Sequence, residues 1–304
     1  MIFGSKNKLD SLCSFGLEDD GICFVRMKEG KNGKLTLENY DFLSGESSVH
    51  PILLKQISKQ YKVKNSTCAT HLKHEDYQLL ISEKPEVPDD DLIDALQWTV
   101  KDVIALPIEN VTLDTFYIPN QTSAKKSINV VAASKDKIAQ LDKPFEEAKL
   151  NLKIIDIEEL ALRNLAILNP HEKNGLVVLW LSEKRGKILF IKDHDIHLTR
   201  NIETGYETIL NSYDGVENIA LEIQRSLDYF ERHYSDIAVQ NLLVMPFNAE
   251  IPHLITFLDK NLSISCHEFF LNEVVEGADT VKKEIVAKNL ITFGTATRRK
   301  EKKK

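Results

Sequence analysis

The chain has 304 residues, 42% of them hydrophobic, which is enough for two lobes with ordinary apolar cores. Its formal net charge of −7 argues against a general nucleic-acid binder, because binding phosphates requires a basic surface. The four cysteines include no CxxC pair, so the sequence predicts neither a zinc site nor a disulfide framework and fits a reducing cytoplasm. With neither the apolar core of a signal peptide nor a run of about eighteen apolar residues, the chain is expected to be soluble.

The first part of the sequence predicts three strands, a helix and a further strand. Apolar runs separated by the turn-forming sequences GLEDD and KEGKNG predict strands over 11–15, 21–27 and 34–43. Ser48 is expected to cap the helix that follows, and residues 66–70 predict a short strand.

A small α/β unit is predicted next, over about 87–153. Its elements are a helix over 89–104, strands over 111–118 and 127–133, a helix over 135–150 and a strand over 152–156. Three aspartates open the first of these helices, where the positive end of the helix dipole favours negative charge. Ser134 is expected to cap the second.

The order of elements then repeats. After a helix over 157–168, the sequence predicts strands over 175–181, 187–192 and 197–202, a helix over 216–234 and a strand over 241–245. Helices over 251–258 and 282–289, with a strand near 262–266, close the chain. Because the repeat lies in the order of elements and not in residue identity, it predicts a duplicated fold.

The helix over 216–234 has two faces. Its apolar residues recur every three or four positions and form one stripe. Glu222, Arg225, Ser226 and Tyr229 form a separate polar ridge, because residues three and four apart are neighbours on a helix surface. Such a ridge can face solvent, a partner or a ligand cleft.

A dense group of potential metal ligands follows the strand over 187–192. Asp193, His194, Asp195 and His197 fall at a turn between two strands, where alternation sends neighbouring side chains to opposite faces. The pattern therefore favours a solvated turn over a metal site.

Other polar and aromatic residues predict little chemistry. His71 and His74 are spaced for one face of a helix but lack a third ligand. Trp98 and Trp180 are interpreted as core or lobe-interface residues, with recognition of a partner as the less favoured alternative. The tail over 298–304, RRKEKKK, has no apolar residue and is expected to be disordered, either as a solubilising end or as a weak contact for anionic lipid headgroups.

Five stretches carry a resemblance to a known family. They are ALQWTVKDVIALPIENVTLDTFYIP (95–119), VVAASKDKI (130–138), KIIDIEELALRNL (153–165), IALEIQRSLDYF (219–230) and FGTATR (293–298). These stretches resemble the type IV pilus-assembly proteins of the PilM family and their relative MshI of the mannose-sensitive haemagglutinin (MSHA) pilus. The resemblance implies an actin-like α/β fold, which is a duplicated ribonuclease H-like fold with two lobes and a small inserted α/β subdomain.

This resemblance implies a division of the chain and a partner. The first lobe core would span 1–86, the inserted subdomain 87–153, the second lobe core 154–297 and the basic tail 298–304. The protein would be cytoplasmic and peripheral at the inner membrane, gripping the N-terminal tail of a bitopic membrane protein of the PilN type. The inserted subdomain, which stands where the related cell-division protein FtsA has its own insertion, would help form the groove for this tail. Other pilus platform proteins would be further partners, and homodimer formation stays open.

Actin-like ATPases hold a nucleotide with two strand hairpins and a pair of small residues, and all three elements look altered here. In the first hairpin, over 15–21, three acidic residues stand where phosphates would lie, and like charges a few ångströms apart repel by about 1 kcal/mol even in water. The second, over 179–187, lacks an aspartate-apolar-glycine core and has bulky Leu181 and Glu183. The third ends in the bulky residues 245–247, whose side chains would fill the nucleotide's space.

The resemblance places Glu222 and Arg225 at the family's ribose and adenine contacts, with a polar face that binds nothing as the alternative. No catalytic or metal-binding residue is expected. We therefore expect a pseudo-ATPase scaffold, similar to the cytoplasmic domain of the type II secretion protein GspL. The alternative is a switch that binds ATP with magnesium and takes its phosphate contacts from Lys184, Arg185 or backbone amides. An FtsA-like filament is disfavoured, because the tail is not an amphipathic helix.

Overall fold

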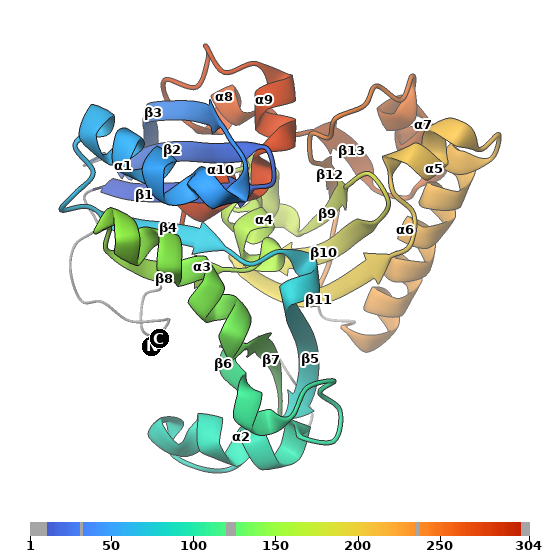
Figure 1. The fold of residues 1–304 in the computed structure, drawn as a ribbon. Helices are drawn as coiled ribbons and strands as arrows, with labels where there is room; N and C mark the ends of the chain where they lie inside the picture. The colour runs from blue at the N-terminus through green and yellow to red at the C-terminus, as the bar shows by residue number, and fades with distance from the viewer. Residues whose placement is uncertain (1–10, 31–32, 120–125, 235–236, 299–304) are drawn as a thin grey trace. The chain divides into compact units, whose positions relative to one another are not determined.

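Two five-stranded sheets with the same strand order are the main feature of the computed structural model, which describes residues 11–30, 33–119, 126–234 and 237–298. The strands of the first sheet are β1 (Ser11–Glu18), β2 (Gly21–Glu29), β3 (Leu35–Ser44), β4 (Thr67–His71) and β8 (Leu152–Asp156). The strands of the second are β9 (Leu176–Leu181), β10 (Gly186–Lys192), β11 (Asp195–Ile202), β12 (Asn241–Val244) and β13 (Ser265–Glu268). Across each sheet the strands lie in the order third, second, first, fourth and fifth of their set (Figure 1). The duplication predicted from the order of elements is therefore confirmed.

The first core is built around Phe15 of β1. Its ring centroid lies 5.2 Å from that of Phe24 and 5.5 Å from that of Phe145. Helices α1 (His50–Tyr61) and α3 (Lys135–Ala148) contact each other and contribute buried side chains to this core. Burying each such aromatic side chain stabilises the fold by about 1.5–3 kcal/mol, so this packing holds both helices on the sheet.

The second core lies beneath a strand that is buried along its whole length. All six residues of β9 are buried, as expected for the central strand of a sheet covered on both faces. The buried residues of helix α6 (Gly215–His233) recur every three or four positions, and Phe230 stacks on Phe190 with ring centroids 4.3 Å apart. The apolar stripe predicted over 216–234 is confirmed. Two more helices of this region are α5 (Tyr206–Asn211) and α7 (Leu254–Asn261).

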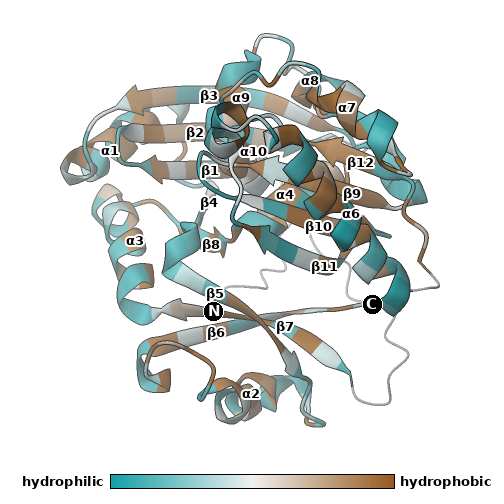
Figure 2. Ribbon diagram, turned by 90° about the vertical axis from the view of Figure 1, so that its right-hand side faces the viewer, coloured by the Kyte–Doolittle hydropathy of each residue, from teal (hydrophilic) through white to brown (hydrophobic). Residues whose placement is uncertain are grey.

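A three-stranded antiparallel sheet interrupts the chain between β4 and β8. Its strands β5 (Tyr77–Glu83), β7 (Ser127–Ser134) and β6 (Val111–Tyr117) lie side by side in that order. Helix α2 (Leu92–Val100) covers one face of it (Figure 2), and the side chains of Leu92, Leu96 and Val100 are buried there. The expected insertion of a small α/β unit into the first half of the fold is thus present.

The described residues cluster into two units, one formed by 1–24 with 39–158 and the other by 25–38 with 159–304. The second unit includes part of the β2–β3 hairpin because the Leu37 amide donates to the Glu276 carbonyl at 2.8 Å. Further helices are α4 (Glu158–Ala166), α8 (Leu271–Val274), α9 (Lys283–Lys288) and α10 (Leu290–Ala296). None of the helices within the described ranges is long and apolar enough to cross a membrane. Residues 299–304 of the predicted basic tail lie outside the described residues.

Local structure differs from the sequence prediction at several places. Helices α5, α8 and α10 were not predicted, and Ser134 precedes α3 without making a side-chain cap hydrogen bond. Strand β5 was not predicted, because its short sequence carries no clear strand pattern. Its extended conformation is stabilised by antiparallel pairing with β7 over seven residue pairs. Ser48 lies in a 3-10 turn, and α1 begins at His50 with a proline in its first turn, so Ser48 does not cap the helix. His71 ends β4 and His74 begins a 3-10 turn, so the two histidines do not share a helix face.

The contact between α4 and α10 gives a first prediction. A Cβ atom added to Gly294 would lie 2.3 Å from the carbonyl oxygen of Ala161, and backbone atoms cannot yield as a flexible side chain can. We expect Gly294→Ala to lower the free energy of unfolding by about 1–3 kcal/mol, measured by urea denaturation. The control is Gly45→Ala, whose added Cβ meets only side-chain atoms of Val49 and Leu53. Equal stability of the two variants would contradict the prediction.

Candidate functional site

Polar side chains gather at the edge of the first sheet where its parallel strands end. β1 pairs in parallel with β4, and β4 with β8, so their carboxyl ends meet at one edge. Glu18, His71 and Asp156 are the last residues of these three strands. In open α/β sheets this edge is where ligands bind, so it is the natural place for a functional site.

His71 lies among carboxylates at this edge. Its Nε2 atom is 3.9 Å from Glu18 Oε1, and its side chain is largely buried. Burial lowers the pKa of His71, because desolvation disfavours the charged ring, and the nearby carboxylates of Glu18, Glu158 and Asp156 oppose this lowering. A neutral imidazole at physiological pH therefore faces three acids.

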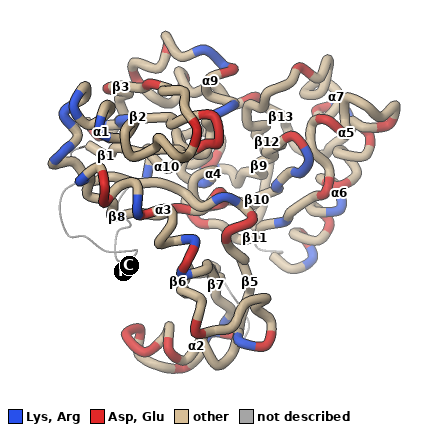
Figure 3. The backbone as a smooth tube through the Cα atoms, in the orientation of Figure 1, with Lys and Arg blue, Asp and Glu red and all other residues tan. Residues whose placement is uncertain are grey.

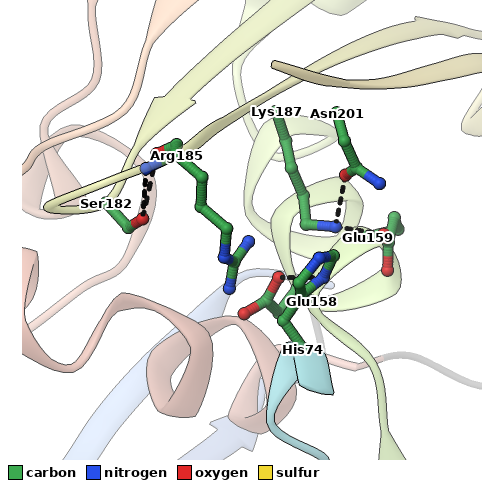
Figure 4. A network of polar contacts seen from close by, with 7 residues as sticks. All are labelled: His74, Glu158, Glu159, Ser182, Arg185, Lys187 and Asn201. Atoms are coloured by element: carbon green, nitrogen blue, oxygen red, sulfur yellow. Dashed lines mark hydrogen bonds and ion pairs between the residues drawn. The ribbon is translucent and has the colours of Figure 1, made fainter. Parts of the chain in front are cut away.

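A second histidine contacts the same edge from the turn after β4. His74 Nδ1 lies 3.7 Å from Glu158 Oε2 (Figure 4). The His74 ring packs edge-on against Tyr77. Glu158 is itself buried at the start of α4. The described residues hold no group of three or more His, Cys, Asp or Glu side chains placed to bind a metal ion.

The acidic β1–β2 turn is stabilised by partners that the sequence did not reveal. Lys73 Nζ donates to Asp19 Oδ1 at 2.7 Å, and this hydrogen bond, with the lysine charge, lowers the pKa of Asp19. His50 Nε2 lies 3.1 Å from the Glu18 carbonyl oxygen, and burial lowers the pKa of His50. Gly21 fits closely against β3, because an added Cβ would lie 2.3 Å from the Leu43 carbonyl. Asp19 and the Glu18 carbonyl of this turn are therefore engaged by other residues of the same chain.

The β9–β10 turn of the second sheet is closed in a similar way. Ser182 Oγ donates to the Arg185 carbonyl at 2.9 Å and accepts from the Arg185 amide at 3.3 Å (Figure 4). The first amides of α5, those of Tyr206 and Glu207, donate to the carbonyls of Ser182 and Glu183 at 2.9 and 3.1 Å. Backbone amides that could face a phosphate at a helix start are thus satisfied by the hairpin itself.

The segment after β12 is packed with bulky side chains. Met245 is fully buried, and its amide donates to the Leu179 carbonyl at 2.8 Å. Phe247 stacks on Tyr206, with ring centroids 6.0 Å apart and planes inclined by 17°. Bulky side chains therefore fill the segment after β12. Actin-like ATPases have small residues at this point, and their replacement here was noted from the sequence.

The predicted pair Glu222 and Arg225 lies on the polar ridge of α6. Arg225 Nη1 donates to Glu222 Oε1 at 2.7 Å, and Arg200 Nη2 of β11 lies 3.7 Å from Glu222 Oε2. Arg200 also donates to Ser226 Oγ at 2.9 Å. Both oxygens of Glu222 therefore face arginines of the same protein. Sequence reasoning missed Arg200, because its strand is brought to α6 only by the fold.

A fully buried ion pair lies at the start of β10, next to the β9–β10 turn. Lys187 donates to Glu159 Oε1 and, at 2.9 Å, to Asn201 Oδ1 (Figure 4). The side chains of Lys187 and Glu159 are 0% and 1% exposed. Sequence reasoning missed this group too, because its two charges come from elements 28 positions apart, although a lysine at the start of the apolar run of β10 was visible.

The remaining sequence-predicted residues fall in different surroundings. Asp193 and His194 have positive φ angles of 53° and 70° in a tight turn, whereas His197 is buried against the rings of Phe230 and Tyr234. The solvated-turn prediction is therefore wrong for His197, because the alternation of β11 turns its side chain toward α6.

The two tryptophans differ sharply in exposure. Trp180 is 8% exposed, in the core as predicted, and the Arg185 guanidinium lies 5.3 Å from its ring centroid. Trp98 is 75% exposed, so its interpretation as a core or interface residue is wrong for this chain. The reason is its position on α2, opposite the stripe of residues that packs on the sheet.

The Lys187 pair gives the second prediction. Lys187→Met leaves the Glu159 carboxylate buried without its cation, so we expect a loss of about 3–5 kcal/mol in the free energy of unfolding, measured by urea denaturation. Adding Glu159→Gln should restore much of this loss, because no buried charge then remains. Lys283→Met, which removes an ion pair with Glu268 whose lysine is 50% exposed, is the control and should cost at most about 1 kcal/mol. A Lys187→Met variant as stable as this control would contradict the prediction.

Comparison with known proteins places these features in a family. The model of the family "Type IV pilus assembly protein PilM" matches residues 46–214, more than half of the chain. No curated protein sequence matches the chain. A solved PilM-PilN type IV pilus biogenesis complex contains a chain that is similar with a TM-score of 0.72 at 14% identity, covering 94% of this chain and 97% of that one.

Two further solved structures are similar over most of their length. The cytoplasmic domain of EpsL, an inner-membrane component of the type II secretion system of Vibrio cholerae, has a TM-score of 0.52 at 11% identity and covers 95% of this chain and 96% of its own. A Bacteroides thetaiotaomicron protein of unknown function, described as having an actin-like ATPase fold, has a TM-score of 0.47 at 10% identity and covers 93% and 96%. The predicted actin-like α/β fold with a duplicated sheet is confirmed. With its family model matched over more than half of its length, the chain belongs to the family of the type IV pilus assembly protein PilM.

Proposed function

We propose that this chain is a scaffold of a type IV pilus assembly platform, at the cytoplasmic side of the inner membrane, that docks the N-terminal tail of a PilN-type membrane protein. The observation that carries the proposal is the likeness, over 94% of the chain, to a chain of the PilM-PilN complex. The match of the family model supports it independently, because it rests on the sequence. The finer likeness to MshI stays a prediction.

The inserted subdomain is the part that we propose for docking. Its exposed large apolar side chains are Ile81, Val87, Trp98, Val103, Leu106 and Tyr117. Exposed apolar groups gathered in one region mark interaction sites more often than scattered ones do. The three-stranded sheet begins with β5 and ends with β7, so we propose 77–134 as the bounds of this subdomain in place of 87–153.

We further propose that the scaffold is a pseudo-ATPase. The hydrogen bonds of the β1–β2 and β9–β10 turns and the packing of Phe247 on Tyr206 support this, because groups that would hold a nucleotide bond to the protein instead. The alternative switch would need Lys184 or Arg185 to take the phosphates. Arg185 is engaged with the Trp180 ring, which argues against that role.

Binding of the partner tail gives the third prediction. A synthetic peptide with the N-terminal cytoplasmic sequence of the PilN-type protein encoded beside this chain should bind saturably, measured by fluorescence anisotropy. A scrambled peptide of the same composition serves as the control, because it keeps the charge and loses the sequence. Absence of saturable binding at several hundred micromolar native peptide would overturn the docking proposal.

Thermal unfolding with nucleotide gives the fourth prediction. ATP with magnesium should leave the melting temperature unchanged, because the candidate phosphate contacts are already engaged. A ligand present at about 100 times its dissociation constant would add about 2.7 kcal/mol, which shifts the melting temperature of a protein of this size by several degrees. A rise of that order that disappears in a Lys184→Ala/Arg185→Ala variant would favour the ATP-binding switch.

A further inference from the structure

The outer face of α2 presents an aromatic ring that is not packed in the core. Leu92, Leu96 and Val100 are spaced four residues apart and pack on the three-stranded sheet. Trp98 lies on the opposite side of the helix and is 75% exposed. A tryptophan side chain can bury about 150–250 Å², and tryptophan is among the residue types enriched where the binding energy of an interface concentrates.

The segment after α2 adds apolar groups and is held in place. Val103 and Leu106 are 63% and 44% exposed. The backbone between them is fixed, because the amides of Val103 and Ile104 donate to the Val100 carbonyl at 3.0 and 3.2 Å and the Ala105 amide donates to Gln78 Oε1 of β5 at 3.0 Å. The exposed side chains thus stand on an ordered backbone and lose little freedom on binding.

This region carries most of the chain's net charge. Residues 83–109 contain eight acidic and two basic side chains, against a formal net charge of −7 for the whole chain. Figure 3 shows the acidic residues along the backbone of α2 and its flanks. Asp94 and Asp102, four residues before and after Trp98, have no ion-pair partner among the described residues. Their charge is therefore available to an external cation.

The Trp98 ring already accepts a cation. The Lys101 ammonium lies 5.3 Å from the ring centroid, a separation at which the ring face attracts positive charge. The other lysine of the region, Lys84, lies 3.6 Å from Asp89 and 4.9 Å from the Tyr117 ring centroid. Both lysines thus lie beside aromatic rings. Because the acidic side chains of residues 83–109 outnumber these two lysines, the surface of this region attracts further positive charge.

We infer that the face formed by Asp94, Trp98, Asp102, Val103 and Leu106, the Trp98 face, binds a short segment that carries lysine or arginine beside an apolar side chain. The occupant is the cytoplasmic segment of the bitopic membrane partner, so this inference rests on the proposed function. Cytoplasmic flanks of membrane-spanning helices are enriched in lysine and arginine, which gives such a segment the required charge. An anionic lipid surface would be repelled by the same acids.

Peptide binding to matched variants tests the inference. The probe is the N-terminal cytoplasmic peptide of the PilN-type protein, in its native form and with every lysine and arginine replaced by glutamine. Trp98→Ala should weaken binding of the native peptide about tenfold or more, and Trp98→Phe less, because a ring remains. Asp94→Asn/Asp102→Asn should weaken binding and reduce its dependence on salt, and the glutamine peptide should bind weakly to every form.

Controls separate the Trp98 face from general effects. Tyr213→Ala removes an aromatic side chain that is 100% exposed and lies far from α2 in sequence, and Glu217→Gln/Glu231→Gln removes two exposed charges from α6. Both controls should bind the native peptide as the unmodified protein does. Since Trp98 is exposed, Trp98→Ala should keep the melting temperature of the unmodified protein.

The possible outcomes distinguish this inference from the proposed function. If the native peptide binds equally well to Trp98→Ala and Asp94→Asn/Asp102→Asn, the inference is overturned while the scaffold proposal stands. Equal binding of the glutamine peptide overturns the charge requirement and with it the inference. If Trp98→Ala alters self-association in sedimentation equilibrium and leaves peptide binding intact, a second copy covers the face and the inference is overturned. Failure of every form to bind overturns the scaffold proposal and this inference together.

Discussion

The parallel pairing of β4 with β8 is the constraint on which the rest of the first unit depends. Two neighbouring parallel strands cannot be joined by a tight turn, so the chain must leave the end of β4 and return to the start of β8 through a crossover. Here the crossover contains the three-stranded sheet, α2 and α3. The same pairing brings Glu18, His71 and Asp156 to one edge, so one register fixes both the polar edge of the sheet and the position of the inserted subdomain.

Sequence periodicity predicted those parts of the fold in which each element carries its own signal. The stripe of α6 and the apolar runs of β9 and β10 are of this kind, because burial on one face or on both leaves a regular pattern. Strand β5 carried no comparable signal and owes its order to β7. The exposure of Trp98 was not predicted, because tryptophan side chains are usually buried. Here the position of Trp98 on α2, opposite the residues that pack on the sheet, leaves its side chain exposed.

The candidate site was less predictable, because its contacts join residues far apart in the sequence. Lys73 meets Asp19 across 54 positions, and Lys187 meets Glu159 across 28. Glu222 and Arg225 were found because three residues separate them on one helix, but Arg200, which completes their network, comes from another element. The proposal of a pseudo-ATPase rests on these internal contacts, because they engage groups that would otherwise be open to a nucleotide.

The crossover has a mechanical consequence for the docking that we propose. Both ends of the inserted subdomain lie side by side, because Tyr77 at the start of β5 pairs with Ala133 near the end of β7. A pull applied to the subdomain would reach β4 at its carboxyl end and, through α3, β8 at its amino end, and these two strands are hydrogen-bonded to each other in parallel. Such a load acts on several hydrogen bonds of the ladder at once rather than opening them one after another, so the attachment resists tension.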